Sequence, residues 1–184
     1  MPDRLERPKT LVFSHANGFP AGTYRRLFDR WRAAGWRVEA IERIGHHPDY
    51  PVTGNWPRLR DELSDRLAQL GSAGPVHLVG HSLGGFLSAM VAAQRPAAVR
   101  GVVLLDSPII AGWVAQGLRL AKSSGLIKRV SPGKVSQRRR HEWPDADAVL
   151  AHFRAKSAFA RWHPQVLDDY VQAGFDPAEH DPAA

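Results

Sequence analysis

The sequence contains no cysteine, and this absence removes several kinds of chemistry at once. Disulfide bonds, thiolate nucleophiles and cysteine-ligated metal sites are all excluded. Long apolar runs are also missing, since no stretch approaches the roughly 18 consecutive apolar residues that a membrane helix needs. The N-terminal segment, residues 1–7, is charged and lacks the apolar stretch of a signal peptide. We therefore expect a cytoplasmic protein that does not enter a membrane.

Acidic residues are missing from one long stretch of the chain. Residues 115–140 hold eight basic residues and no acidic one, within a sequence of net charge +7. Such a stretch could bind phosphates or an anionic substrate. It lacks, however, the interleaved aromatic side chains that are typical of single-stranded nucleic acid binding. We interpret it as a solvated, arginine-rich surface and do not expect nucleic acid as a partner.

Strand and helix patterns alternate over the first 110 residues. Short apolar or alternating runs predict strands at residues 10–13, 36–41, 76–79 and 99–105. Helical spacing of apolar residues predicts helices at residues 24–34, 56–70 and 86–94. Strands that alternate with helices, two of them almost continuously apolar, indicate an α/β fold whose parallel sheet is covered on both faces.

The character of the sequence changes after residue 109. Helical or irregular segments follow at residues 109–120, 144–160 and 164–172, and no further run of strand length occurs. We therefore expect three regions: an α/β core at residues 1–110, a helical cap-like segment at 111–175, and a flexible tail at 176–184.

The strongest motif is the pentapeptide Gly80–Gly84, which has Ser82 at its centre and lies between a predicted strand and a predicted helix. A sharp turn there lifts the serine hydroxyl above the sheet edge, and the flanking residues must be small to avoid the strand and the helix. The helix that follows points its N-terminal amides at the site, which favours developing negative charge. The pattern predicts Ser82 as a nucleophile; an idle serine in a glycine-rich turn is the alternative.

A second motif, residues 14–20, follows the first predicted strand and is rich in small and turn-forming residues. Acyl transfer needs two N–H donors for the oxyanion. We expect one to be the N–H of Leu83 and the other to be that of Asn17 or Phe19. His15 could serve as a base, although we expect it to hydrogen-bond the loop and hold its shape.

The two motifs, in this order and separated by one strand–helix unit, resemble the α/β-hydrolase superfamily. The segment His15–Pro20, followed by Tyr24, is similar to the oxyanion segment of its bacterial esterase-like members. The resemblance covers roughly residues 9–110 and implies a partial α/β-hydrolase fold, with about four mostly parallel strands, flanking helices and a helical cap segment. It also implies a small-molecule ester or thioester as substrate, and neither a metal nor an organic cofactor.

The acid and the base of the triad are harder to place. In the family, an acid and then a histidine follow the serine in chain order. Asp106, after the last predicted strand, stands at one position for that acid, or it caps the helix predicted from Pro108. His46 and His47 precede the serine, and none of the later histidines follows a predicted strand: His141, His152, His163 and His180.

We therefore expect a chain truncated after the cap; the alternative is a complete four-stranded protein with an unusual or absent base. A sheet that stops near residue 106 would leave an open edge, through which copies of the chain could associate. The leading hypothesis is a serine hydrolase, inactive if the histidine is missing. A non-catalytic hydrolase-like protein that binds acyl compounds or a partner is the second hypothesis.

Overall fold

The computed structural model describes residues 9–70, 74–107, 140 and 142–176. The chain divides into two compact units, one of residues 1–107 with 145–184 and the other of residues 108–144. The helices and strands given below all belong to the first unit. The helix expected at 109–120, the basic stretch 115–140 apart from Arg140, and nearly all of the expected tail lie outside the described residues.

A parallel sheet forms the centre of the first unit. Its strands run side by side in the order β2-β1-β3-β4. The register pairs Ser14 with Gly80 and His81 with Leu105, so the carboxyl ends of three strands meet at one edge. In open α/β sheets this edge is where ligands bind. The four strands are β1 (Thr10–Ser14), β2 (Arg37–Ala40), β3 (Val76–His81) and β4 (Val99–Leu105).

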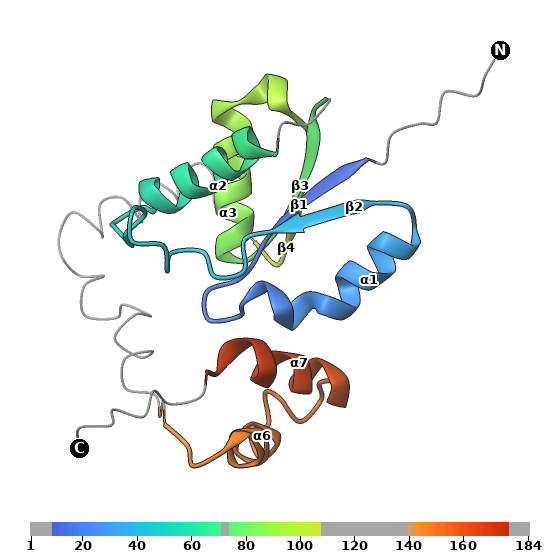
Figure 1. Cartoon of the computed structure of the whole chain (residues 1–184), viewed down its shortest axis with the longest axis vertical. Coiled ribbons are helices and arrows are strands. Elements are labelled where there is room, and N and C mark those ends of the chain that lie inside the picture. Colours follow the sequence, from blue (N-terminus) through green and yellow to red (C-terminus); the bar gives the residue numbers. More distant parts are fainter. Residues whose placement is uncertain (1–8, 71–73, 108–139, 141, 177–184) are drawn as a thin grey trace, which may run out of the picture. The chain divides into compact units, whose positions relative to one another are not determined.

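Helices cover both faces of the central strands (Figure 1). Val12 and Leu78 pack against α2 and α3, whereas Phe13 and Val79 pack on the other face with Phe28 of α1. Successive side chains of a strand point to opposite faces, which explains why neighbouring residues enter different clusters. The elements are η1 (Ala21–Tyr24), α1 (Arg25–Ala33), α2 (Pro57–Gln69), α3 (Leu83–Gln94) and η2 (Pro96–Ala98).

Strand β4 departs from the expectation of a sheet covered on both faces. Val103 is 50% exposed and Val102 is 36% exposed, whereas Val12 and Phe13 of β1 are fully buried. In the described part of the chain β4 pairs only with β3 and is therefore an edge strand. An apolar sequence predicts a strand but not its place in the sheet, so the prediction was wrong for β4.

Two further helices, α6 (Ala146–Arg154) and α7 (Pro164–Gly174), belong to the same compact unit as the sheet. Each begins at a side-chain cap: the carboxylate of Asp145 accepts from the N–H of Ala148 at 2.7 Å, and Nδ1 of His163 accepts from the N–H of Gln165 at 3.3 Å. Such caps satisfy backbone donors that the first helical turn leaves free. The helices share an aromatic cluster of Phe153, Phe159, Trp162, Tyr170 and Phe175.

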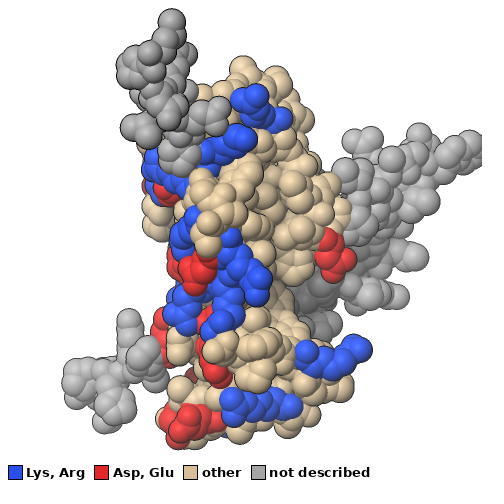
Figure 2. Space-filling model, turned by 90° about the vertical axis from the view of Figure 1, so that its right-hand side faces the viewer, with Lys and Arg blue, Asp and Glu red and all other residues tan. Residues whose placement is uncertain are grey.

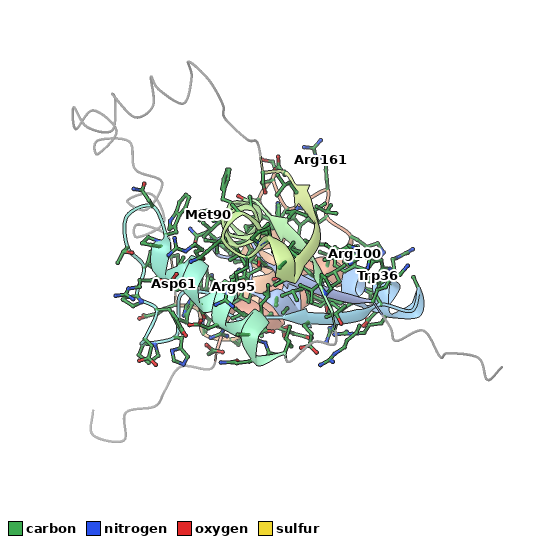
Figure 3. All side chains as sticks on the ribbon, turned by 90° about the horizontal axis from the view of Figure 1, so that it is seen from above. Trp36, Asp61, Met90, Arg95, Arg100 and Arg161 are labelled. Atoms are coloured by element: carbon green, nitrogen blue, oxygen red, sulfur yellow. The ribbon has the colours of Figure 1, made fainter. Side chains whose placement is uncertain are left out.

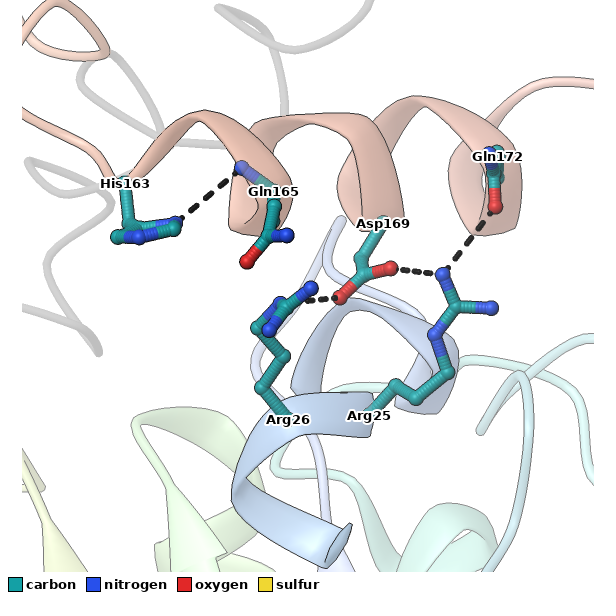
Figure 4. Close-up of polar contacts among 6 residues, drawn as sticks. All are labelled: Arg25, Arg26, His163, Gln165, Asp169 and Gln172. Carbon is teal, nitrogen blue, oxygen red and sulfur yellow. Dashed lines mark hydrogen bonds and ion pairs between the residues drawn. The ribbon is translucent and has the colours of Figure 1, made fainter.

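Helix α7 is fixed to the start of α1 by a buried carboxylate (Figure 4). Asp169 is only 3% exposed and accepts a hydrogen bond from Arg25. Nε of Arg26 lies 3.8 Å from the second carboxylate oxygen, and Arg25 also donates to Gln172 at 3.3 Å. A buried carboxylate needs such partners because water no longer solvates its charge. The contact therefore joins α7 to the sheet-forming part of the chain.

The surface carries charges of both signs. Helix α1 holds four arginines and one aspartate, and Figure 2 shows a face on which Lys and Arg side chains gather with Asp and Glu among them. Mixed charges of this kind are usual on a solvated surface. Within the described residues, no helix combines the length and apolarity that crossing a membrane would require.

Candidate active site

Ser82 occupies the sharp turn between β3 and α3. Its backbone has φ 51° and ψ −115°, a conformation that a non-glycine residue rarely adopts. The N–H of Ser82 donates to the carbonyl of Leu105 at 2.9 Å, and its own carbonyl accepts from the N–H of Gly85 at 3.0 Å. Strained backbone that the surroundings hold in place is a mark of functional sites. The turn is therefore held from both β4 and α3.

The glycines of the pentapeptide are needed because backbone passes very close to them. A Cβ on Gly84 would lie 1.9 Å from the carbonyl oxygen of Ser14, and a Cβ on Gly80 would lie 2.3 Å from the carbonyl of Gly84. Both distances are far below van der Waals contact. The close packing of β1, β3 and α3 beneath Ser82 therefore depends on these two residues having no side chain.

Ser107 contacts the turn of Ser82 and was not among the residues expected from the sequence. It is 6% exposed, and its hydroxyl donates to the carbonyl of Ser82 at 2.9 Å and lies 3.1 Å from that of Leu105. Its Oγ would lie 2.1 Å from a Cβ on Gly85, so the serine fills the space that this glycine leaves. The available signal was a small polar residue two positions after an apolar strand. Ser107 supports the turn from below.

The loop after β1 holds the two N–H groups, those of Asn17 and Phe19, that were expected as alternatives for the second oxyanion donor. The N–H of Phe19 donates to the carbonyl of Ala16 at 3.1 Å and so closes a turn within the loop. Among the described residues, no partner is found for the N–H of Asn17 or for that of Leu83, the first residue of α3. Both Asn17 and Leu83 border the same pocket as Ser82. Of the two loop candidates, Phe19 therefore has its N–H engaged within the loop.

His15 is buried and both of its ring nitrogens are engaged. Its Nε2 accepts from the N–H of Ile44 at 2.7 Å, so the proton is on Nδ1, which donates to the carbonyl of Ala16 at 2.8 Å. Burial lowers the pKa of His15 below its ordinary value of 6.5, although the Ala16 hydrogen bond and Glu42 oppose that effect. The ring is therefore neutral near pH 7 and holds the loop, which leaves no free nitrogen for a catalytic base.

Tyr24 connects the loop after β1 to the turn that carries Ser82. Its oxygen accepts from the N–H of Ala16 at 3.3 Å, and its hydroxyl proton is then available to Nδ1 of His81 at 2.7 Å. Burial raises the pKa of Tyr24 to about 12, so the phenol stays protonated and can donate. One side chain thus holds the two walls of the site in a fixed relation.

We expect Tyr24→Phe to reduce the free energy of unfolding by about 1–2 kcal/mol, because it removes two hydrogen bonds while it keeps the ring. The substitution keeps the aromatic ring because the ring packs in the core, with its centroid 4.6 Å from that of Phe13. Urea denaturation followed by circular dichroism measures the change. Tyr50→Phe is the matched control, because its hydroxyl bonds only Asp65 at a partly exposed position. Equal losses for the two variants would contradict a special role for Tyr24.

Ser82 opens into a pocket of about 290 Å3 at the carboxyl ends of the strands. Its polar lining includes Arg43 and His46, from the loop that follows β2. This loop is held by two buried side chains, since Ile44 donates to His15 and the N–H of Gly45 donates to Glu62 at 2.9 Å. The apolar lining comes from Phe19, Ile44, Val52, Trp56, Leu59, Leu83 and Phe86.

The remaining site candidates are placed as follows. Asp106 comes directly after β4, is exposed and has φ 48°, but no described histidine bonds its carboxylate. His46 lines the pocket, whereas His152 lies in α6 and His163 caps α7. The other two later candidates, His141 and His180, lie outside the described residues.

The chain is similar to known hydrolases in sequence. A model of the Alpha/beta hydrolase family matches residues 11–183. Monoglyceride lipase of Mus musculus is 32% identical over 132 residues, which are 68% of this chain and 44% of that protein. The Probable esterase PIR7A of Oryza sativa subsp. indica is 30% identical over 127 residues, 67% of this chain and 47% of the relative. The chain thus matches about half the length of these relatives.

Solved structures share the fold. A thioesterase domain from the curacin biosynthetic pathway superposes with a TM-score of 0.65 at 22% identity, over 94% of this chain and 61% of that one. E-2-(acetamidomethylene)succinate hydrolase superposes with a TM-score of 0.64 at 24% identity, over 92% of this chain and 57% of that one. At these identities the likeness concerns the fold.

Proposed function

The chain belongs to the alpha/beta hydrolase family, and on that premise we propose that it is a serine hydrolase acting on a carboxylic ester or thioester. The observation that carries the proposal is the backbone of Ser82, which is held in a strained turn between β3 and α3 and lines a pocket. A strained serine at this place in the fold is the arrangement that exposes a nucleophile. The lipase and esterase among the relatives support an ester as the bond cleaved.

In the proposed reaction, Oγ of Ser82 attacks the carbonyl carbon of the substrate and its proton passes to a histidine base. The carbonyl oxygen becomes an oxyanion, which the N–H groups of Leu83 and Asn17 stabilise. Collapse of the intermediate breaks the bond to the alcohol or thiol, and the leaving group takes the proton. Water then gives a proton to the histidine and attacks the acyl carbon; the bond from that carbon to Oγ of Ser82 breaks, Oγ takes the proton back, and the acid is released. Asp106 is proposed to orient the base.

A second function, binding without turnover, is favoured by one observation. Two histidines close to Ser82 already form structural hydrogen bonds. His81, beside Ser82 in sequence, bonds through Nδ1, and His15, in the pocket wall, bonds through both ring nitrogens. A serine without a base is a weak nucleophile. A chain of this kind would bind an acyl compound in the pocket and release it unchanged.

The two functions are separated by labelling the folded chain with a fluorophosphonate, which reacts covalently with an activated serine. We expect labelling of the parent and complete loss in Ser82→Ala. Ser157→Ala, at an exposed position outside the pocket, should label like the parent. Circular dichroism confirms that each variant is folded. A folded parent chain that does not react would reject the hydrolase and favour the binding protein.

Two finer parts of the proposal concern surfaces. We propose that α6 and α7 act as a cap-like part of the site, supported by contacts of Phe19 with Tyr170 and Trp162 at ring-centroid distances of 5.3 and 5.9 Å. We also propose that copies of the chain associate through β4, because this strand has no second partner among the residues that the structure describes, an edge strand can pair with another chain, and Val103 is half-exposed. A cytoplasmic location stays a prediction.

A further inference from the structure

The apolar side of the pocket contains the most exposed large apolar side chain in the described residues. Val52 is 65% exposed and Trp56 is 38% exposed, and both line the pocket that Ser82 lines. Val102 and Val103, on the edge strand, are the other large apolar side chains exposed to this degree in the described residues. An apolar surface that adjoins a nucleophile is available to bind the apolar part of a substrate.

Trp56 adopts a backbone conformation that does not suit it. It has φ 57° and ψ 35°, in the left-handed region, directly after Asn55 with φ 65°. A bulky residue in this region is a true outlier, because its Cβ crowds the following carbonyl oxygen. Trp56 also precedes the first turn of α2 without giving it a side-chain cap. Asparagine or glycine would suit this backbone better, so local structure gives no reason for an indole here.

Two backbone hydrogen bonds and one ring contact hold Trp56 in place. The N–H of Trp56 donates to the carbonyl of Thr53 at 3.1 Å, and its carbonyl accepts from the N–H of Arg60 at 3.0 Å. The ring lies nearly parallel to that of Phe86, with an interplanar angle of 15° and centroids 6.2 Å apart. Phe86 is four residues after Ser82 on α3 and donates its N–H to the serine carbonyl at 3.3 Å. The two rings therefore stack on one another in the pocket lining, and Phe86 lies about one helical turn from Ser82.

Gly45 brings the loop after β2 close to the same wall. A Cβ at Gly45 would lie 3.0 Å from Leu59 and 3.2 Å from Val52, and its φ of 84° also favours glycine. The loop can therefore approach Val52 and Leu59 and narrow the pocket. At about 290 Å3, the pocket is at the lower end of the volumes typical of small-molecule sites.

We propose that Trp56, with Phe86 and Val52, is the specificity-determining subsite for a small apolar group of the ester, and that the strained backbone at Trp56 serves this binding. The inference rests on the proposed function for its relevance to catalysis. It extends that function by naming the residue that selects the substrate: binding of the apolar group covers an indole that is otherwise exposed to water. The left-handed backbone at Trp56 lowers the stability of the fold, and the exposed indole is the feature that this loss of stability provides.

The test is the binding of 4-nitrophenyl butyl ether, an ester analogue that cannot be hydrolysed, measured by isothermal titration calorimetry. We expect Trp56→Asn to raise the dissociation constant about tenfold or more, because a tryptophan in a pocket commonly dominates binding. The melting temperature of Trp56→Asn should stay the same or rise, because asparagine tolerates the left-handed backbone. Trp56→Phe, which keeps an aromatic ring, should bind with an intermediate dissociation constant.

Trp36→Ala is the matched control for the loss of an indole. Trp36 packs edge-to-face on His77 at 5.0 Å and immediately precedes β2, so it lies at the amino ends of the strands and does not line the pocket. Figure 3 labels Trp36 together with Arg100, a residue at the start of β4 and so also at the amino ends of the strands. The folded Trp36→Ala chain should bind the ether like the parent. Equal binding by the parent and Trp56→Asn, or no binding by the parent, would overturn the proposal.

The labelling of Ser82 separates this inference from the proposed function. The ether should protect Ser82 of the parent chain from the fluorophosphonate and should protect Trp56→Asn much less at the same concentration. If Ser82 labels but the ether neither binds nor protects, the subsite is wrong and the hydrolase stands. If the ether binds and Ser82 does not label, the subsite is retained and the hydrolase is rejected.

Discussion

Gly84→Ala should unfold the chain or reduce its free energy of unfolding by more than about 4 kcal/mol, a loss that only a few mechanisms can cause. The added Cβ would lie 1.9 Å from the carbonyl oxygen of Ser14 and 2.7 Å from that of His15. Both are backbone atoms in or directly after β1, so no change of rotamer relieves the overlap. Either β1 or α3 must move, and each carries part of the buried core around Val12 and Leu87.

The measurement is urea denaturation followed by circular dichroism, with Gly54→Ala as the matched control. Nothing lies within 4 Å of a Cβ on Gly54, and its φ is not positive. The control should therefore differ from the parent by no more than roughly 0.5 kcal/mol. If Gly84→Ala unfolded at the same urea concentration as Gly54→Ala, the close approach of α3 to β1 beneath Ser82 would be incorrect.

Asp169→Ala should reduce the free energy of unfolding by about 2–3 kcal/mol, as expected for the loss of charged hydrogen bonds at a buried position. The carboxylate side chain is 2% exposed, whereas those of Arg25 and Arg26 are 57% and 47% exposed. The arginines can therefore return to water when the partner is removed, which keeps the loss at the lower end of the range for buried ion pairs. Figure 4 shows the carboxylate between the two guanidinium groups.

Asp168→Ala is the control, since it removes the same type of side chain from the neighbouring position. Asp168 is 41% exposed and lies 3.6 Å from Arg154, so its removal should cost less than about 1 kcal/mol. Amide hydrogen exchange gives a second readout, because Asp169→Ala should accelerate exchange in α7 before it affects β1 and β3. Similar exchange of α7 in the two variants would show that Asp169 does not fix this helix.

Much of the fold was predictable because the local sequence patterns match the strands and helices that build the parallel sheet. The apolar runs at residues 10–13 and 76–79 correspond to β1 and β3, and the helical spacing from Trp56 corresponds to α2, Pro57–Gln69. Strand order was not predictable, because it depends on which strands pair across long stretches of sequence. The exposure of Val103 follows from that order and not from the composition of β4.

The site was predictable only where its geometry depends on residues that are neighbours in the sequence. Small residues around Ser82 follow from the turn itself, and the structure has Gly80 and Gly84 where the backbones of β1, β3 and α3 pass close to one another. The choice between Asn17 and Phe19 was beyond sequence reasoning, since it rests on a turn in which Phe19 donates to Ala16. Ser107 and Trp56 were missed for a similar reason: Ser107 fills the space that Gly85 leaves, and Trp56 has a φ that no sequence pattern predicts.

The bond between Tyr24 and His81 has a consequence for how the site meets its ligand. Because Tyr24 joins the loop after β1 to the turn of Ser82, the two walls cannot drift apart between encounters. At the proposed site, a ligand would therefore meet the amide of Leu83 and the loop after β1 in a fixed arrangement, and little conformational entropy would be lost on binding. The conformational entropy of these two walls is lost when the chain folds, so it does not have to be lost again each time a ligand binds.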